Sequence, residues 1–403
     1  MKANIIFRAP VYSQSGYGAH SRDIIMSLWN SQKFNISLLP TGWGSTSVSL
    51  SSLSLKEKEA LNFMANNKLH QDISFIFVHV GIPSEFQKIG HYNVGITAGL
   101  EADKIPKDWV DSCNNIDLII VPSNFVKTVF INSGVTTSIE VIEEGVNTDI
   151  FNEKEIDIPN AFLQEVDTPF NLLSTGQWLH GGIKEDRKGI GLLIDTFLKT
   201  FEHNKNIGLI LKTFTSNNSS VDFELTKERL NDLKGSNKYP KIYIMHGNLT
   251  DLEMSYLYKH PKVKGYMSLT SGEGWGRGVA ESIACDLPVA VTSWGGQMHY
   301  LNSNYNYLIN YSLGPVSKSA LMSRLFSPDM IWAYPDVKDA KKKMSDLMEN
   351  PHTNKKKAAE YGEIFRKLYN KETIYNKLLN LFNSIYTNSN KPSSFRKVGI
   401  EVI

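Results

Sequence analysis

Short apolar runs recur along the chain, and stretches with apolar residues on one helical face separate them. In the first part, the runs predict strands at residues 4–10, 34–40, 73–80, 92–99, 116–123 and 139–147. Residues 19–30 and 123–134 read as helices between such strands, the second capped by Ser123. Near-continuous apolar strands that alternate with helices are typical of a parallel sheet covered on both faces.

The same alternation restarts in the second part of the chain. Strands are expected at residues 170–177, 207–214, 241–248, 265–271 and 287–294. Helices are expected at residues 189–202, 222–234, 250–260 and 279–285, followed by long helices over 354–386 and a polar tail over 388–399. The pattern predicts an α/β protein with two doubly wound, Rossmann-like parallel sheets that face each other across a cleft.

Residues 150–170 are acidic and irregular, which is typical of a linker between domains. We therefore expect a first domain at residues 1–165 and a second at 166–370. The remaining residues, 371–403, are expected to form a helix that packs back on the first domain, plus the polar tail.

Charge is uneven along the chain. Residues 1–165 carry 12 Lys and Arg against 18 Asp and Glu, whereas the remainder carries 31 against 23. A basic second half suits an anionic ligand such as a nucleotide, and an acidic first half is a poor surface for gripping nucleic acid.

The two cysteines, Cys113 and Cys285, form neither a disulfide framework nor a zinc motif, which favours a reducing compartment. No apolar run approaches the roughly 18 residues of a membrane span. We expect a cytoplasmic protein without a transmembrane segment, and leave peripheral membrane contact open.

The loop after the first expected strand contains Gly16, Tyr17 and Gly18, with Ser21 where the dinucleotide fingerprint has its last glycine. No acidic residue ends the second strand, so a nicotinamide cofactor is disfavoured. A tight turn without a ligand is one interpretation, and a loop that faces a phosphate or an acceptor is the other. The sequence has no P-loop and no Asp-x-Asp pair, and its histidines are isolated, so neither a bound metal nor a cofactor is expected.

Glu273 and Glu281 lie eight residues apart in GEGWGRGVAESIACDLPVAVTSWGG, a glycine-rich loop that follows a strand and opens a helix near Gly278. In the simplest interpretation, Glu281 stabilises the first turn of the helix and Glu273 is a solvated loop residue. Arg277 in this loop and the pair Arg187-Lys188 in another strand-to-helix loop favour a second interpretation. Glycine N–H groups and cations that converge at the ends of parallel strands can bind a diphosphate.

These motifs resemble the retaining glycosyltransferases of family 4, which have the GT-B architecture of two Rossmann-like domains. The stretch from Gly272 resembles their Glu-x7-Glu motif, and residues 119–130, 141–151 and 187–197 resemble further family segments in the right order. GEGWG together with RAPVYSQSGYGAHSR is similar to a branch found in bacteriophages.

The resemblance implies a hexosyl- or pentosyltransferase that uses a nucleotide-diphosphate sugar, whose base the sequence leaves open, with retention and without metal. It implies that Glu281 binds the ribose, that Lys188 and Arg187 bind the diphosphate, and that Glu273 lies beside the transferred sugar. It also implies donor contacts from two backbone segments and Arg277, and a catalytic first-domain acid, for which Glu101 is preferred over Asp103. The two backbone segments are Gly274, Trp275 and Gly276, and the turn of Gly247, Asn248 and Leu249 beside the base.

Three functions stay open at this point. The first is transfer to a glycan, a lipid-linked sugar or a small molecule. The second is transfer to a hydroxymethylated base in DNA, as the phage-like motifs suggest, although the acidic first domain disfavours DNA as a partner. The third is a protein that binds a nucleotide sugar without catalysis.

Overall fold

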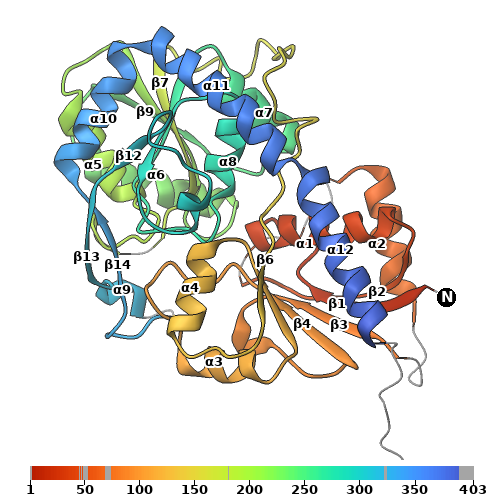
Figure 1. Ribbon diagram of the computed structural model, residues 1–403. Helices are drawn as coiled ribbons and strands as arrows, with labels where there is room; N and C mark the ends of the chain where they lie inside the picture. The colour runs from red at the N-terminus through yellow and green to blue at the C-terminus, as the bar shows by residue number, and fades with distance from the viewer. Residues whose placement is uncertain are drawn as a thin grey trace, which may run out of the picture.

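The computed structural model describes residues 2–44, 46, 48, 53–68, 74–179, 181–321 and 325–389. Two six-stranded parallel sheets form its framework, and helices cover both faces of each (Figure 1). The predicted fold class, α/β with two doubly wound parallel sheets, is confirmed.

The first sheet has the strand order β2-β1-β3-β4-β5-β6. Its strands are β1 (Ala3–Ala9), β2 (Phe34–Pro40), β3 (Ile76–Val80), β4 (Tyr92–Ile96), β5 (Leu118–Val121) and β6 (Ile139–Val141). The helices of this unit are α1 (Gly16–Asn30), α2 (Leu55–Asn66), the short η1 (Pro83–Glu85), α3 (Lys107–Asn114) and α4 (Asn124–Asn132). Ser123 caps α4 as predicted, because its side chain accepts a hydrogen bond from the N–H of Val126.

The second sheet has the order β12-β11-β10-β7-β8-β9. Its strands are β7 (Phe170–Gln177), β8 (Ile207–Phe214), β9 (Lys241–Met245), β10 (Val263–Ser268), β11 (Val289–Thr292) and β12 (Tyr307–Ile309). Its helices are α5 (Ile190–Thr200), α6 (Ser220–Lys234), α7 (Asp251–Lys259), α8 (Arg277–Ala284), η2 (Gly296–His299), α10 (Val337–Glu349) and α11 (Pro351–Tyr369). The central strands β7, β8, β10 and β11 carry the apolar runs and are largely buried.

Two elements that the sequence did not predict join the units. The strands β13 (Tyr311–Pro315) and β14 (Ile331–Pro335) form an antiparallel pair next to α9 (Lys318–Leu321). Trp332 of β14 packs in one buried cluster with Trp109 of α3 and Phe130 of α4. The pair thus follows β12 of the second sheet directly in the chain, and its apolar side chains pack against the first unit.

The last helix, α12 (Lys371–Ser389), leaves the second unit and lies along α1 (Figure 1). Its residues Ile374, Leu378 and Phe382 are buried in the cluster that covers the first sheet. The chain therefore crosses between the units twice, once near Val146 and once near Asn370. These two segments pair through hydrogen bonds from the N–H of Val146 to Tyr369 O, 2.8 Å, and from the N–H of Lys371 to Val146 O, 3.0 Å.

Residues 152–169, which connect the two sheets, contain neither helix nor strand, as expected for a linker. Apart from the two residues that end α12, the predicted polar tail lies outside the described residues. In the part of the chain that the structure describes, no helix combines the length and apolar character that crossing a membrane would need.

Candidate active site between the two units

The site lies where β7 and β10 end side by side at the centre of the second sheet. After β7 the chain continues to β8 and β9 on one side of the sheet, and after β10 it continues to β11 and β12 on the other side. The strand order therefore reverses between β7 and β10, and the loops that follow these two strands diverge and leave a crevice there. The loops are joined by the N–H of Ser271, which donates to Arg187 O at 2.8 Å. Gly189 adopts a φ of +67°, and a Cβ there would lie 2.0 Å from Leu269 O, so only glycine permits this approach.

Four charged side chains meet in the crevice. Lys188 Nζ lies 2.7 Å from Glu273 Oε1 and 2.6 Å from Glu273 Oε2. Arg187 Nη1 pairs with Glu101 Oε1, and Lys188 Nζ lies 4.0 Å from the same oxygen. Glu101 follows β4 in the first unit and the other three belong to the second, so the cluster spans both units. The four side chains are 12 to 23% exposed, which leaves them open to a ligand.

Asp186 is a site residue that the sequence analysis missed. Its buried carboxylate accepts hydrogen bonds from the N–H of Lys188, at 3.1 Å, and of Ile190, at 2.8 Å, and so satisfies the first N–H of α5, whose N-cap position is Gly189. Burial raises the pKa of Asp186, and the backbone hydrogen bonds oppose that shift. In a sequence, an aspartate shortly before an apolar helix is a signal for the start of that helix. Because Asp186 occupies the first N–H of α5, an anion is left to bind the side chains of Arg187 and Lys188.

The glycine-rich loop before α8 is pressed against the first unit. A Cβ on Gly274 would lie 2.1 Å from Ala98 O, and Gly274 O accepts a hydrogen bond from Ser123 Oγ at 2.9 Å. The carbonyls of Trp275 and Gly276 both accept from Tyr300 Oη. The N–H groups of residues 274–276 donate to no other described residue, although Gly274 and Trp275 are themselves buried.

The side chain of Trp275 is part of the core. This is compatible with the prediction, which assigned donor contacts only to the backbone of Trp275. Its side chain is 2% exposed and packs against Tyr300, with ring centroids 4.7 Å apart. The indole also packs against Tyr369, with ring centroids 5.7 Å apart, near the point where the chain crosses from the second unit to the first.

One detail of α8 differs from the prediction. The helix begins at Arg277, near Gly278 as expected, but Glu281 lies in its second turn and not in its first, which has no acidic residue. Glu281 therefore does not complement the helix dipole from the first turn. It accepts a hydrogen bond from Tyr258 Oη at 3.1 Å, and burial raises its pKa to about 7, against the nearby charge of Arg277.

Arg277 reaches into the first unit. Its Nη1 lies 3.2 Å from both Asp23 Oδ2 and Glu144 Oε2, and its Nε lies 3.8 Å from Glu281 Oε1. Neither Asp23 nor Glu144 stood out in the sequence, since no local pattern marks a carboxylate whose partner is more than 130 residues away. With these partners Arg277 ties the units together beside Glu281.

The loop of Gly16, Tyr17 and Gly18 forms the first turn of α1, which starts three residues earlier than predicted. A Cβ on Gly18 would lie 2.1 Å from Ser13 O, whereas Gly16 has open space around it. Tyr17 Oη lies 3.0 Å from Thr97 Oγ1 and accepts from the N–H of Ala98 at 2.9 Å. The loop therefore borders the residues that contact Gly274.

Asp103, the alternative to Glu101, and His299 both lie outside the charged cluster. Asp103 Oδ1 accepts from the N–H of Ile331 at 2.8 Å, which ties this aspartate to β14. His299 Nδ1 accepts from the N–H of Asn124 at 3.2 Å, and its Nε2 lies 3.4 Å from Glu143 Oε1. Burial alone would raise the pKa of Glu143, but hydrogen bonds from His299 and Lys377 lower it to about 2.

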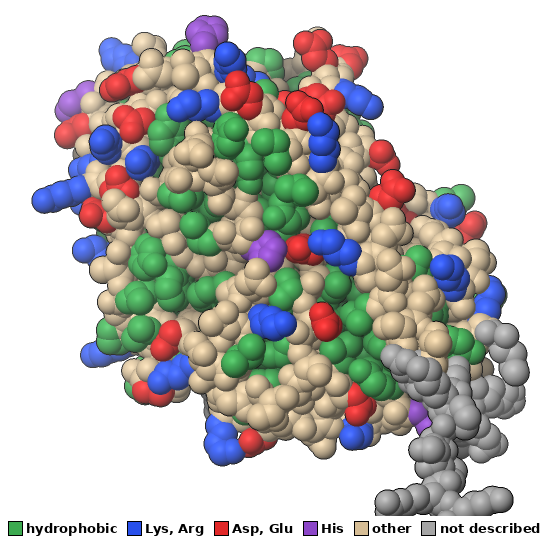
Figure 2. All heavy atoms as spheres, viewed as in Figure 1, with side chains coloured by type: hydrophobic (Ala, Val, Ile, Leu, Met, Phe, Trp, Pro, Cys, Tyr) green, Lys and Arg blue, Asp and Glu red, His purple; other side chains and the backbone are tan. Residues whose placement is uncertain are grey.

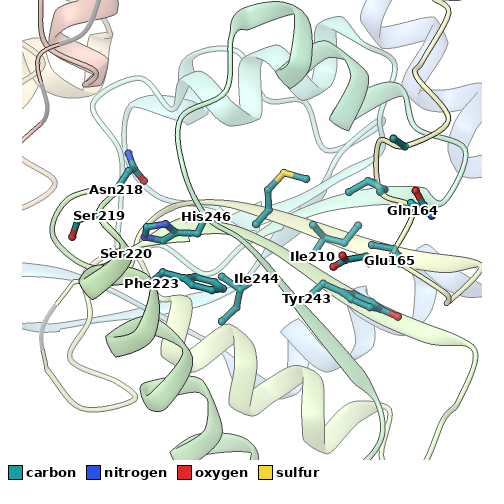
Figure 3. A pocket seen from close by; sticks show the side chains of 14 residues that line it. Gln164, Glu165, Ile210, Asn218, Ser219, Ser220, Phe223, Tyr243, Ile244 and His246 are labelled. Atoms are coloured by element: carbon teal, nitrogen blue, oxygen red, sulfur yellow. The ribbon is translucent and has the colours of Figure 1, made fainter.

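The turn of Gly247, Asn248 and Leu249 follows the edge strand β9. Gly247 has a φ of +100°, and Asn248 Oδ1 accepts a hydrogen bond from Asn218 Nδ2 at the start of α6. A cavity of about 790 Å³ extends from here along β9, between His246 and Phe223 at one end and Gln164 and Glu165 of the linker at the other (Figure 3). This cavity is lined by none of the four charged residues of the crevice.

Among the described residues, no group of three or more His, Cys, Asp or Glu side chains is arranged to hold a metal ion. Both cysteines are buried, and burial raises the pKa of each thiol to about 12.

Solved structures share this fold along nearly the whole chain. HepE from Anabaena, solved with UDP and glucose, superposes with a TM-score of 0.64 at 13% identity, covering 95% of this chain and 100% of HepE. Sucrose-phosphate synthase from Thermosynechococcus elongatus gives 0.64 at 14% identity over 96% of this chain and 100% of that one. A glycosyltransferase from Rickettsia africae gives 0.63 at 16% identity, over 96% and 99%.

No protein-family model and no curated protein matches the sequence. The structural likeness nevertheless defines the class of fold. The chain has the GT-B architecture, in which two Rossmann-like units face each other, as found in these glycosyltransferases.

Proposed function

We propose that the protein is a glycosyltransferase that moves a hexosyl or pentosyl group from a nucleoside-diphosphate sugar to an acceptor hydroxyl. The observation that carries the proposal is the charged cluster of Lys188, Arg187, Glu273 and Glu101 at the switch point of the second sheet. Two cations and two carboxylates in one crevice match a donor whose diphosphate is anionic and whose sugar ring becomes positive as it leaves.

The donor lies along the glycine-rich loop in this proposal. Lys188 and Arg187 bind the diphosphate together with backbone N–H groups of residues 274–276, and Glu281 accepts hydrogen bonds from the ribose. The turn of Gly247 to Leu249 borders the base. Glu273 lies beside the sugar, so the loop reaches from one end of the donor to the other.

The chemistry follows from the charges. Cleavage of the bond between the anomeric carbon and the phosphate oxygen leaves negative charge on the diphosphate, which Lys188 and Arg187 stabilise, and positive character on the ring, which Glu273 stabilises. Glu101 approaches the same point from the first unit and is the proposed first-unit catalytic acid. We further propose retention of configuration and metal-independent transfer, as the resemblance to family 4 implies, and a place in its bacteriophage branch.

The proposed division of labour follows the two sheets. Residues 1–165 bind the acceptor, residues 166–370 bind the donor, and residues 371–403 contribute a helix that packs back on the first unit, plus a polar tail. Two observations support this division: the donor residues follow strands of the second sheet, and α12 packs on α1.

The first experiment is thermal denaturation of the purified protein with UDP, GDP, ADP, CDP, TDP and the corresponding glucose nucleotides, each with and without a chelator. UDP is the first choice because HepE, which shares the fold, was solved with UDP. A stabilisation by one base that survives chelation is the expected result. The absence of stabilisation by every nucleotide would contradict the proposed donor site, and loss of the effect on chelation would contradict metal independence.

A further inference from the structure

Two aromatic side chains from separate loops of the first unit stack on each other at the cleft. Tyr17 lies in the first turn of α1 and Trp43 lies in the loop after β2, with ring centroids 4.0 Å apart and planes inclined by 23°. Both residues are half-buried, so part of each remains accessible. We call this pair the Tyr17–Trp43 platform.

The platform is held in place from below. Tyr17 Oη is within 3.0 Å of Thr97 Oγ1 and accepts from the N–H of Ala98, both of which directly follow β4. Burial raises the pKa of Tyr17 to about 12, so the ring stays neutral at physiological pH. An anchored neutral tyrosine is a rigid support for the indole that covers it.

The loop that carries Trp43 is also attached to the body of the first unit. The N–H of Thr41 donates to Ala9 O at 3.0 Å, and the N–H of Thr46 donates to Trp43 O at 3.0 Å. Val48 forms an antiparallel bridge with Ser13, in the loop between β1 and α1. Backbone contacts thus fix the loop both before and after Trp43 in the sequence.

The platform lies next to the proposed reaction centre. Ala98, whose N–H binds Tyr17, presses its carbonyl against Gly274 of the glycine-rich loop, one residue after Glu273. Gly16, adjacent to Tyr17, is exposed and has no neighbour within 4 Å of a Cβ position, so space remains beside the ring. A group bound on the platform would therefore stand between the first unit and the sugar of the donor.

Charge on this side of the cleft disfavours an anionic ligand. The first unit contributes the carboxylates Asp23, Glu101 and Glu144 to ion pairs with the second. Arg22, which is near the platform, donates to the carbonyls of Val11 and Ser13 at 2.9 Å. On the face seen in Figure 2, Lys and Arg side chains are interspersed with Asp and Glu over both units, without the basic stripe that a nucleic acid backbone would need.

We propose that the Tyr17–Trp43 platform binds the apolar face of a sugar ring in a neutral carbohydrate acceptor. One face of a pyranose presents C–H groups, whose partial positive charge suits the negative π face of an indole, while the hydroxyls at its rim stay available for transfer. This inference rests on the proposed function and names the class of acceptor. It assigns Trp43 as the residue that makes the stacking contact and Tyr17 as its support.

The test is saturation-transfer difference NMR on the full chain saturated with UDP. The probes are neutral disaccharides built from glucose, galactose, mannose and N-acetylglucosamine. At least one disaccharide is expected to receive saturation at its ring C–H protons, and Trp43→Ala and Trp43→Leu are expected to weaken its binding about tenfold. Trp43→Phe keeps an aromatic face and should keep most of the binding.

Phe63→Ala is the matched control. Phe63 is 59% exposed on α2, packs at a tilt against Trp29 with ring centroids 5.4 Å apart, and should be removable without loss of sugar binding. UDP binding, measured calorimetrically in the same samples, shows that each variant is folded with a working donor site.

The outcomes separate the two proposals. If UDP binds but no disaccharide does, or if Trp43→Ala and Trp43→Leu bind sugar as well as the wild type does, the platform proposal is wrong and the proposed function stands. If no nucleotide binds the wild type, both fall. If a duplex oligonucleotide bound saturably and Trp43→Ala abolished this binding, the ligand of the platform would be a nucleobase and not a carbohydrate.

Discussion

The carboxylate of Glu101, which follows β4 in the first unit, is paired with the guanidinium of Arg187, which precedes α5 in the second unit. The neighbouring cation, Lys188, is paired with Glu273 at 2.6 Å. In the absence of a ligand, both cations proposed for the donor diphosphate therefore have carboxylate partners. A diphosphate that binds Arg187 competes with Glu101, so donor binding and the contact between the units are coupled.

This competition predicts the effect of Glu101→Gln. Removing the carboxylate frees Arg187, and UDP is expected to bind about two- to fivefold more tightly, the equivalent of a solvent-accessible ion pair. Turnover should fall, because the proposed first-unit acid is lost. Calorimetric titration with UDP and initial rates with the donor measure the two effects.

Asp103→Asn is the matched control, since Asp103 lies in the same loop but is bonded to the N–H of Ile331 in β14. It should leave UDP affinity unchanged. Weaker UDP binding in Glu101→Gln would show that Glu101 organises the donor site instead of competing with the donor.

Lys188→Ala is expected to weaken UDP binding by about 10- to 150-fold, the equivalent of a hydrogen bond to a charged group. Compensation by Arg187 would put the effect at the lower end of this range. Lys184→Ala removes an exposed lysine from the same loop and serves as the control in the calorimetric titration. Equal affinities in the two variants would remove Lys188 from the diphosphate site.

Glu273→Gln should separate binding from catalysis. The amide keeps the size of the side chain but loses the negative charge that stabilises the developing positive sugar. We expect UDP affinity to stay within a few-fold of the wild type and turnover to fall by about 100-fold or more. The measurement is the steady-state rate with the donor identified by thermal denaturation. If Glu273→Gln turned over as fast as the wild type, Glu273 would be only a loop residue whose charge neutralises Lys188.

The raised pKa of Glu281 predicts a pH-dependent stability. The folded protein keeps the proton of this carboxyl up to about pH 7, whereas the unfolded chain releases it near its ordinary pKa of 4.5. This group therefore lowers stability progressively as pH rises from 4.5 to 7, with no further change above that. Glu281→Gln lacks the titration, so its melting temperature relative to wild type should increase between pH 5 and pH 7.

The exposed Glu228→Gln provides the baseline for this comparison, because it makes the same chemical change on the outer side of α6. A constant difference between Glu281→Gln and wild type across the pH range would mean that Glu281 is ionised in the folded protein well below pH 7.

Gly274→Ala tests how closely the units approach each other. The added Cβ would meet Ala98 O at 2.1 Å, and both partners of this contact are backbone, so the units would have to separate. We expect a lower melting temperature and reduced turnover. Gly16→Ala adds the same methyl group where nothing lies within 4 Å and should leave the melting temperature unchanged; an equally small change in melting temperature at Gly274 would mean that the units move apart freely.

The sequence by itself determined the local elements of this protein. The apolar runs at 34–40, 170–177 and 207–214 coincide with β2, β7 and β8, because a strand buried on both faces needs an unbroken apolar stretch. The glycine and charge pattern also singled out Lys188 and Glu273, since strand-to-helix loops of a parallel sheet converge at one edge.

Only the tertiary structure decided which of these residues meet. The strands β13 and β14 have exposed or mixed faces and pack against α3 and α4, so no periodicity marked them. Asp23 and Glu144 are ordinary surface-type carboxylates in sequence, and they became parts of the site because the first unit sets them against Arg277. Glu101 was expected from the family resemblance, but its pairing with Arg187 follows only from the tertiary structure. Local patterns record propensity and burial, whereas a contact between residues 80 or 250 positions apart depends on how two complete units pack.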